Sequence, residues 1–99
     1  MAKYKVFVDR EIRDLVPGYL ENRRREVAEL FSFHSAGNFK AIRKAGHRLA
    51  GSGGGYGFDR LSELGQQLEE LSQAGDAAGV AARLADLKEY LENLEVVYR

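Results

Sequence analysis

Residues 38–57 read NFKAIRKAGHRLAGSGGGYG, a stretch that combines a helical pattern with a run of glycines. Apolar and small residues recur there at steps of three and four, at Phe39, Ile42, Gly46, Leu49, Gly53 and Tyr56. Asn38 can cap the first turn, so we predict an amphipathic helix that begins at residue 39 and keeps its period through the glycines. Each glycine in a helix interior costs roughly 0.8–1 kcal/mol relative to alanine, so packing or function must require them.

His47 is the residue of this helix with the most useful chemistry. It follows Gly46 on the stripe by one position, which is about 100° round the helix axis, so we expect it at the rim of the buried seam and partly exposed. Its face is shared with neighbours three, four and seven residues away, namely Arg43, Lys44, Ala50, Gly51 and Gly54. One side of the ring is therefore basic, and the other is almost free of side chains.

Three further helical patterns surround this one. The first runs from Pro17 to Ala36 and stops at Gly37, and the next begins at Phe58 or Asp59 and stops at Gly75. The last is capped by Asp76 and continues at heptad-like steps to Tyr98. Because short connections favour antiparallel neighbours, we predict an all-α, antiparallel up-down four-helix bundle over about residues 17–98.

Residues 1–16 form a lead-in to the bundle. Tyr4, Val6 and Val8 alternate with polar residues as in an extended segment, and Asp9 can cap a short helix from Arg10 to about Val16. The chain of 99 residues is long enough for one core, so we expect residues 1–99 to form a single domain.

Composition excludes several classes of function. The chain has 15 Lys and Arg against 15 Asp and Glu, so no overall basic field favours nucleic acid or a membrane surface. It has no cysteine, which excludes disulfides and thiolate sites and suits a reducing compartment. The apolar stretch before Asp9 is too short for a signal peptide or a membrane span, so we expect a cytoplasmic protein.

Other motifs point to structure. The glycine run lacks the Lys-Ser/Thr of a P-loop, because Phe58 follows Gly57. His34 lies on the core stripe of its helix, where an imidazole can bond terminal carbonyls, and it is too far from His47 in sequence for a His-Glu-x-x-His metal motif. The glycines can also allow close packing of helices. Tyr56 and Phe58 can either pack in the core or contact a partner.

A longer set of residues carries a family resemblance. It begins with His47-Arg48-Leu49-Ala50-Gly51-Ser52-Gly53, includes Gly57, and continues with Leu61, Leu64, Leu68 and Glu69. This set resembles the signature of histidine-containing phosphotransfer (HPt) domains. In that family the histidine lies on the second long helix of a four-helix bundle and exchanges a phosphoryl group with an aspartate of a receiver domain.

The resemblance implies roles for individual residues. His47 would be the phosphoacceptor, Gly51 the small residue beside its ring, and Glu69 the side chain that orients the imidazole through the other ring nitrogen. The family usually has lysine three residues after the histidine, where this chain has Ala50. We expect the missing charge to come from the cations nearby, Arg43, Lys44 and Arg48.

The resemblance also implies the partners. These would be response-regulator receiver domains, and a hybrid histidine kinase is a further candidate. The chain itself would be a monomeric phosphocarrier and not an enzyme, would need no cofactor, and would meet the divalent metal on the receiver. Two alternatives stay open at this stage: a docking module that binds receivers without being phosphorylated, as Ala50 suggests, and a structural bundle that self-associates.

Overall fold

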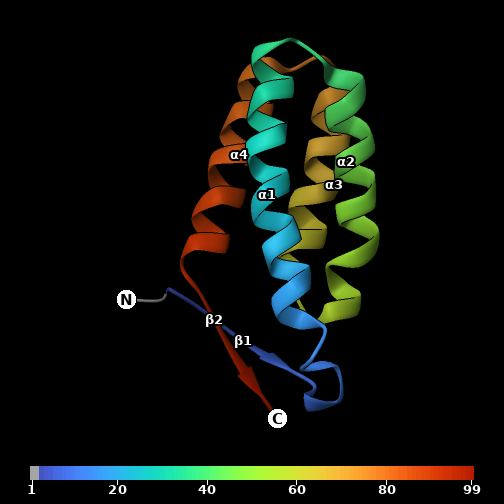
Figure 1. Ribbon diagram of the computed structural model, residues 1–99. Helices are drawn as coiled ribbons and strands as arrows, with labels where there is room; N and C mark the ends of the chain where they lie inside the picture. The colour runs from blue at the N-terminus through green and yellow to red at the C-terminus, as the bar shows by residue number, and fades with distance from the viewer. Residues whose placement is uncertain (1–2) are drawn as a thin grey trace.

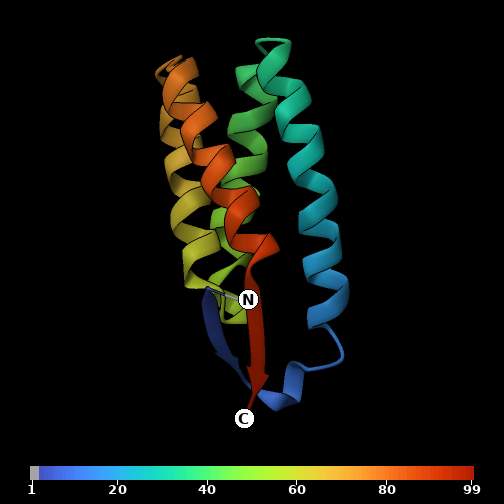
Figure 2. The ribbon, with the colours of Figure 1, turned by 90° about the vertical axis from the view of Figure 1, so that its left-hand side faces the viewer.

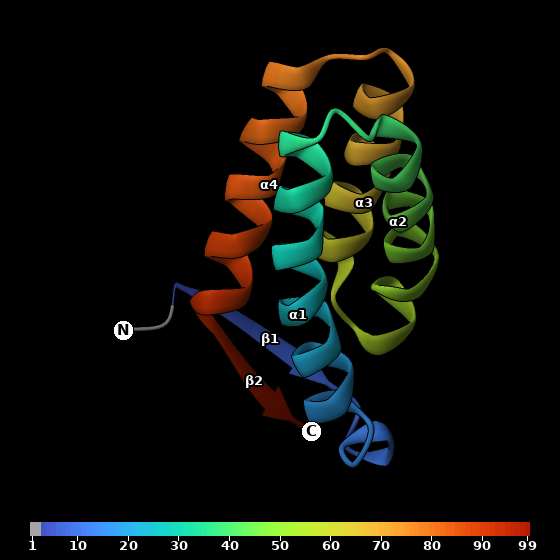
Figure 3. The same cartoon turned by 45° about the horizontal axis from the view of Figure 1, so that its top comes forward.

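The computed structural model describes residues 3–99 and contains four long helices (Figure 1). They are α1 (Val16–Ser35), α2 (Phe39–Ser52), α3 (Asp59–Gln73) and α4 (Ala77–Glu92). In Figure 1 the chain ascends in α1 and α3 and descends in α2 and α4. With the top of the molecule brought forward, α1 lies beside α4 and α2 beside α3 (Figure 3). The helical bundle expected from the sequence is therefore present.

The two turns at the upper end of the bundle (Figure 1) lie where the sequence indicated. The side chains of Asn38 and Asp76 accept hydrogen bonds from the backbone N–H groups of Ala41 (3.2 Å) and Gly79 (2.9 Å), and so cap α2 and α4. Gly37 and Gly75 follow α1 and α3 with φ of 69° each, a left-handed conformation that glycine adopts without steric cost. Local signals thus define the two turns at one end of the bundle.

The core lies between the four helices, and leucine is its commonest residue. Fully buried side chains come from every helix and from the residue before α3, and the largest include Leu30, Ile42, Phe58, Leu64, Leu68 and Leu84. Burial of a side chain of this size contributes about 1.5–3 kcal/mol relative to leaving it in water. Packing along the predicted stripes therefore stabilises the bundle.

The C-terminal segment differs from the prediction. The fourth helix was expected to continue to Tyr98, but α4 ends at Glu92 and residues Leu94–Tyr98 form strand β2. This strand pairs in parallel with β1 (Tyr4–Val8), with Val6 opposite Val96. Valine and tyrosine favour a pleated strand, and the lead-in offers a partner whose backbone groups would otherwise be unpaired. The bundle therefore ends near residue 92, not 98.

The two strands lie below the helices, beyond the lower ends of α1 and α4 (Figure 2). Val8 is buried against the bundle, and Gly57 lies beside it: a Cβ at Gly57 would be in ordinary van der Waals contact with the Val8 side chain, at 3.4 Å. The lead-in continues as a short 3-10 helix, η1 (Arg10–Ile12), capped by Asp9 as expected but shorter than the predicted helix from Arg10 to about Val16.

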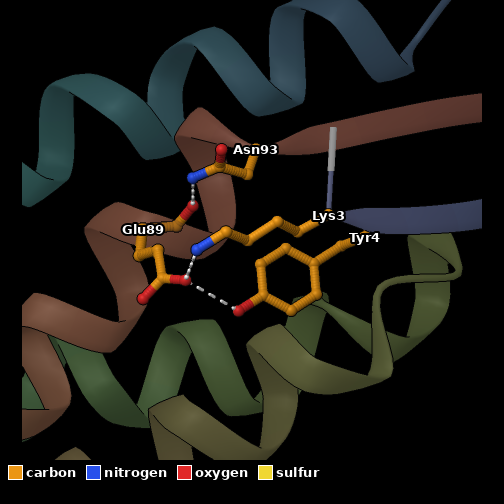
Figure 4. A network of polar contacts seen from close by, with 4 residues as sticks. All are labelled: Lys3, Tyr4, Glu89 and Asn93. Atoms are coloured by element: carbon orange, nitrogen blue, oxygen red, sulfur yellow. Dashed lines mark hydrogen bonds and ion pairs between the residues drawn. The ribbon is translucent and has the colours of Figure 1, made fainter. Parts of the chain in front are cut away.

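Lys3 and Tyr4, where the described part of the chain begins, are hydrogen-bonded to Glu89 of α4 (Figure 4). Its carboxylate accepts hydrogen bonds from Lys3 Nζ (3.1 Å) and Tyr4 OH (3.2 Å), while its backbone carbonyl accepts one from the Asn93 side chain (2.8 Å). The hydrogen bonds from Lys3 and Tyr4, together with the Lys3 charge, lower the pKa of Glu89 from its ordinary value. This carboxylate therefore links the strands to the helices in its ionised form.

The lowered pKa gives this link a pH dependence. Because the folded state favours ionised Glu89, its contribution is present at neutral pH and is lost as the pH falls through the lowered pKa. We expect Glu89→Gln to reduce thermal stability near pH 7 and to have little effect near about pH 3, as measured by melting curves over that range. Glu92→Gln, which removes a carboxylate of α4 whose ion pair is with Lys88 of the same helix, is the control. A stability difference that stays constant with pH would contradict this assignment.

Candidate functional site

His47 projects from α2 into solvent, with 76% of its side chain exposed. Its Nδ1 atom lies 3.0 Å from Oε2 of Glu69, a residue of α3 whose side chain is 32% exposed. Both residues were singled out in the sequence, and the packing of α2 on α3 brings them together. The ring is therefore accessible at its outer edge and held at its inner edge.

The chemistry of the two groups defines the proton position on the ring. An ionised carboxylate can only accept a hydrogen bond, so Nδ1 carries the ring proton and donates a hydrogen bond to Glu69. In neutral imidazole the other nitrogen, Nε2, then holds a free electron pair. Among residues 3–99 no hydrogen bond to Nε2 is formed. The arrangement presents a nucleophilic nitrogen to solvent.

Two shallow hollows flank the ring, and they differ in charge. The hollow on the N-terminal side of α2 is lined by Arg43, Lys44, Arg48, Glu69 and Gln73. The hollow on the other side is lined by Ala50, Gly51, Ser62, Glu63, Gln66 and Glu69. A dianionic group on Nε2 would therefore be attracted toward the first hollow, where the cations lie, and would meet little bulk at Ala50 and Gly51.

The three cations differ in their surroundings. Arg43 and Lys44 are exposed, and within residues 3–99 no carboxylate lies at ion-pair distance from either. Arg48 points toward α1, where its guanidinium nitrogen is 4.0 Å from Oε2 of Glu26. Partial burial raises the pKa of Glu26, although Arg23 and Arg48 each act to lower it. Arg43 and Lys44 are thus the cations with no competing partner.

The glycine run does not continue α2 as expected. The helix ends at Ser52, and residues Gly54–Tyr56 form a 3-10 turn, η2, followed by Gly57 with φ of 92°. Gly54 was expected on this helix, one turn further along the face of His47, but it lies in η2. Its N–H instead donates to Ser62 Oγ (2.8 Å), because consecutive glycines favour the tighter turn over a helix interior.

Sequence reasoning missed Ser62, Gly65, Gln66 and Gln73. Ser62 connects the end of α2 to α3, since its hydroxyl also donates to the carbonyl of Ala50 (2.9 Å). The signal available in the sequence was the helical spacing of residues 62, 66 and 73 from Glu69, which puts all four on one face of α3. Such a face is ordinarily solvated, so the pattern alone does not indicate a site.

Tyr56, Phe58 and His34 make contacts within the bundle. Phe58 is fully buried, and Tyr56 stacks on Tyr19 with ring centroids 4.0 Å apart. His34 Nε2 donates a hydrogen bond to the backbone carbonyl of Ala77 (2.9 Å) and so connects the end of α1 to the start of α4. The carbonyl that it bonds therefore belongs to α4 and not to the last turn of its own helix.

Within residues 3–99, no group of three or more His, Cys, Asp or Glu side chains is arranged to hold a metal ion. None of the helices in that range has the length and apolar character needed to cross a membrane.

Comparison with known proteins gives the family. The family model described as Hpt domain matches residues 11–96, nearly the whole chain. The chain therefore belongs to the Hpt domain family, which implies a phosphotransfer role in two-component signalling. Proteins of this family are phosphocarriers that work with receiver domains and histidine kinases. No curated protein and no solved structure matches the chain.

The contact between Arg48 and Glu26 can be tested by titration. Because the Arg48 charge lowers the pKa of Glu26, Arg48→Ala is expected to raise that pKa further. The measurement is the carboxyl ¹³C shift of Glu26 as a function of pH. Lys44→Ala removes a similar charge from the same helix and should leave the Glu26 titration unchanged. An unchanged titration in the Arg48 variant would mean that the two side chains do not interact in solution.

Proposed function

We propose that this chain is a phosphorelay intermediate that accepts a phosphoryl group on His47 from an aspartate of one receiver domain and passes it to another. The observation that carries the proposal is the exposed ring bonded to Glu69 at 3.0 Å in a chain of the Hpt domain family. A solvent-exposed imidazole held by a carboxylate is the arrangement that nucleophilic transfer requires.

The transfer step follows from the state of the ring. The Nε2 electron pair attacks the phosphorus of the receiver's aspartyl phosphate in line with the bond that breaks. The new N–P bond forms, the P–O bond to aspartate breaks, and the leaving electron pair stays on the aspartate carboxylate. No proton needs to leave Nε2, because the ring proton is on Nδ1. The ring becomes positive, and the Glu69 carboxylate offsets that charge.

The phosphoryl group itself needs positive charge, which most of the family supplies by a lysine three residues after the histidine. Since this chain has Ala50 there, we assign the role to Arg43 and Lys44, which share the hollow beside the ring and have no carboxylate at ion-pair distance within residues 3–99. Arg48 is a weaker candidate because it lies near Glu26. Gly51 and Ala50 leave room for the receiver's backbone.

The division of work between the partners also belongs to the proposal. The receiver would supply the aspartate and its divalent metal, and this chain would need no cofactor of its own. We propose that it acts as a monomer in the cytoplasm, where it meets receivers and possible donors such as a hybrid histidine kinase through a small transient interface.

Phosphorylation of His47 tests the proposal directly. Incubation with a phosphorylated receiver is expected to give a phosphate on the chain that is labile in acid and stable in base. His47→Gln should abolish it, whereas His34→Gln, the matched control, should retain it. Mass spectrometry with receivers from the same organism is the measurement.

The alternatives predict different outcomes of the same experiment. Receiver binding without phosphate on His47 would favour a docking module that has lost the chemistry, as Ala50 would suggest. Absence of both binding and phosphate, with oligomers that grow with concentration, would favour a structural bundle that self-associates.

The assignment of the cations gives a second test. Replacing Arg43 and Lys44 together by alanine should slow phosphoryl transfer at least roughly tenfold, because two charges near the transferred group are lost. The measurement is the single-turnover rate from a phosphorylated receiver. The control, Arg24→Ala with Lys88→Ala, also removes one arginine and one lysine, but from α1 and α4. Equal rates for the site variant and the wild type would remove these residues from the mechanism.

A further inference from the structure

We propose that Gly46 and Gly65 are positioning residues for the phosphoacceptor, because they set the spacing between α2 and α3 at which Glu69 reaches His47. The consequence for transfer rests on the proposed function. The effect on the ring itself does not, and it can be measured without any receiver.

Gly46 directly precedes His47 and is buried against α3. A Cβ atom on Gly46 would lie 2.7 Å from the carbonyl oxygen of Gly65 and 2.9 Å from the backbone nitrogen of Glu69. Such separations are shorter than real Cβ contacts, and both obstacles are backbone atoms that no side-chain rotation can move. A methyl group here would therefore displace the residue that bonds the ring.

Gly65 makes the reciprocal contact one helical turn before Glu69. A Cβ atom on it would lie 2.5 Å from the backbone nitrogen of Ala50 and 2.7 Å from the carbonyl oxygen of Gly46. The two backbones thus touch beside the bridge between His47 and Glu69. Interhelical distance depends on the side chains at the point of contact, and here no side chain separates the helices.

The hydrogen bond tolerates little change in this spacing. It measures 3.0 Å, and a donor–acceptor distance of about 3.6 Å no longer makes a hydrogen bond. To reach ordinary contact, an added Cβ on Gly46 must move the α3 backbone by several tenths of an ångström. A displacement of that size is comparable with the whole margin of the bond.

Gly53 separates this role from simple packing. A Cβ on Gly53 would meet Leu61 Cβ at 2.8 Å, Ser62 N at 2.8 Å and Phe58 O at 2.9 Å, so the crowding matches that at Gly46. This contact, however, lies at the end of α2 and away from Glu69. Gly53→Ala should therefore reduce stability without affecting the ring.

The test is the tautomer of His47, read from its ring ¹⁵N chemical shifts in the full chain. We expect the wild type to have the proton on Nδ1, and Gly46→Ala to lose this preference while remaining helical by circular dichroism. Gly53→Ala should keep it. In a Glu69→Ala background, Gly46→Ala should cause no further change in the tautomer, because the two substitutions act through the same bond.

A second variant decides the matter if Gly46→Ala does not fold. Glu69→Asp shortens the side chain by one methylene. The helices cannot move closer to make up this length, because the backbones of Gly46 and Gly65 are already in contact. The preference for the proton on Nδ1 should therefore be lost. The proposal is overturned if either variant keeps the wild-type tautomer, or if Gly53→Ala alters it as much as Gly46→Ala. A normal tautomer pattern with no phosphate on His47 would instead refute the proposed function alone.

Discussion

The site depends on direct contact between the backbones of α2 and α3. Where Gly46 meets Gly65, no side chain lies between the helices, and the chain can hold a carboxylate of one helix against an imidazole of the other. Burial alone would not give this precision, because apolar side chains can be repacked at modest cost. The surrounding leucines stabilise the bundle, whereas we propose that the glycines set the distance between the two candidate residues, His47 and Glu69.

Most of the bundle could be predicted from the sequence because its signals are local. Caps at Asn38 and Asp76 and left-handed glycines at residues 37 and 75 mark the helix ends through interactions within a few residues. The C-terminal strand could not be predicted in this way. Leu94 and Tyr98 continue the heptad spacing of α4, and only the distant segment Tyr4–Val8 makes a strand preferable there.

The candidate site was predictable to the level of residue positions and not of distances. The spacing of His47 and Glu69 within a family-like motif was sufficient to pair them, and the structure gives their separation. The end of α2 was mispredicted because the apolar spacing continues to Tyr56, whereas the glycines after Ser52 have a low helix propensity and end the helix. The different surroundings of Arg43 and Arg48 depend on Glu26 of another helix, which no local pattern reveals.

The parallel pairing of β1 with β2 has a consequence for the order of folding. Register pairs such as Tyr4 with Leu94 join segments separated by nearly the whole chain, whereas each helical hairpin joins neighbours. The entropy lost on closing a loop grows with its length, so contacts between remote segments form slowly unless intervening structure has already shortened the path. The bundle provides that shortening, and strand pairing is expected to be the final step of assembly.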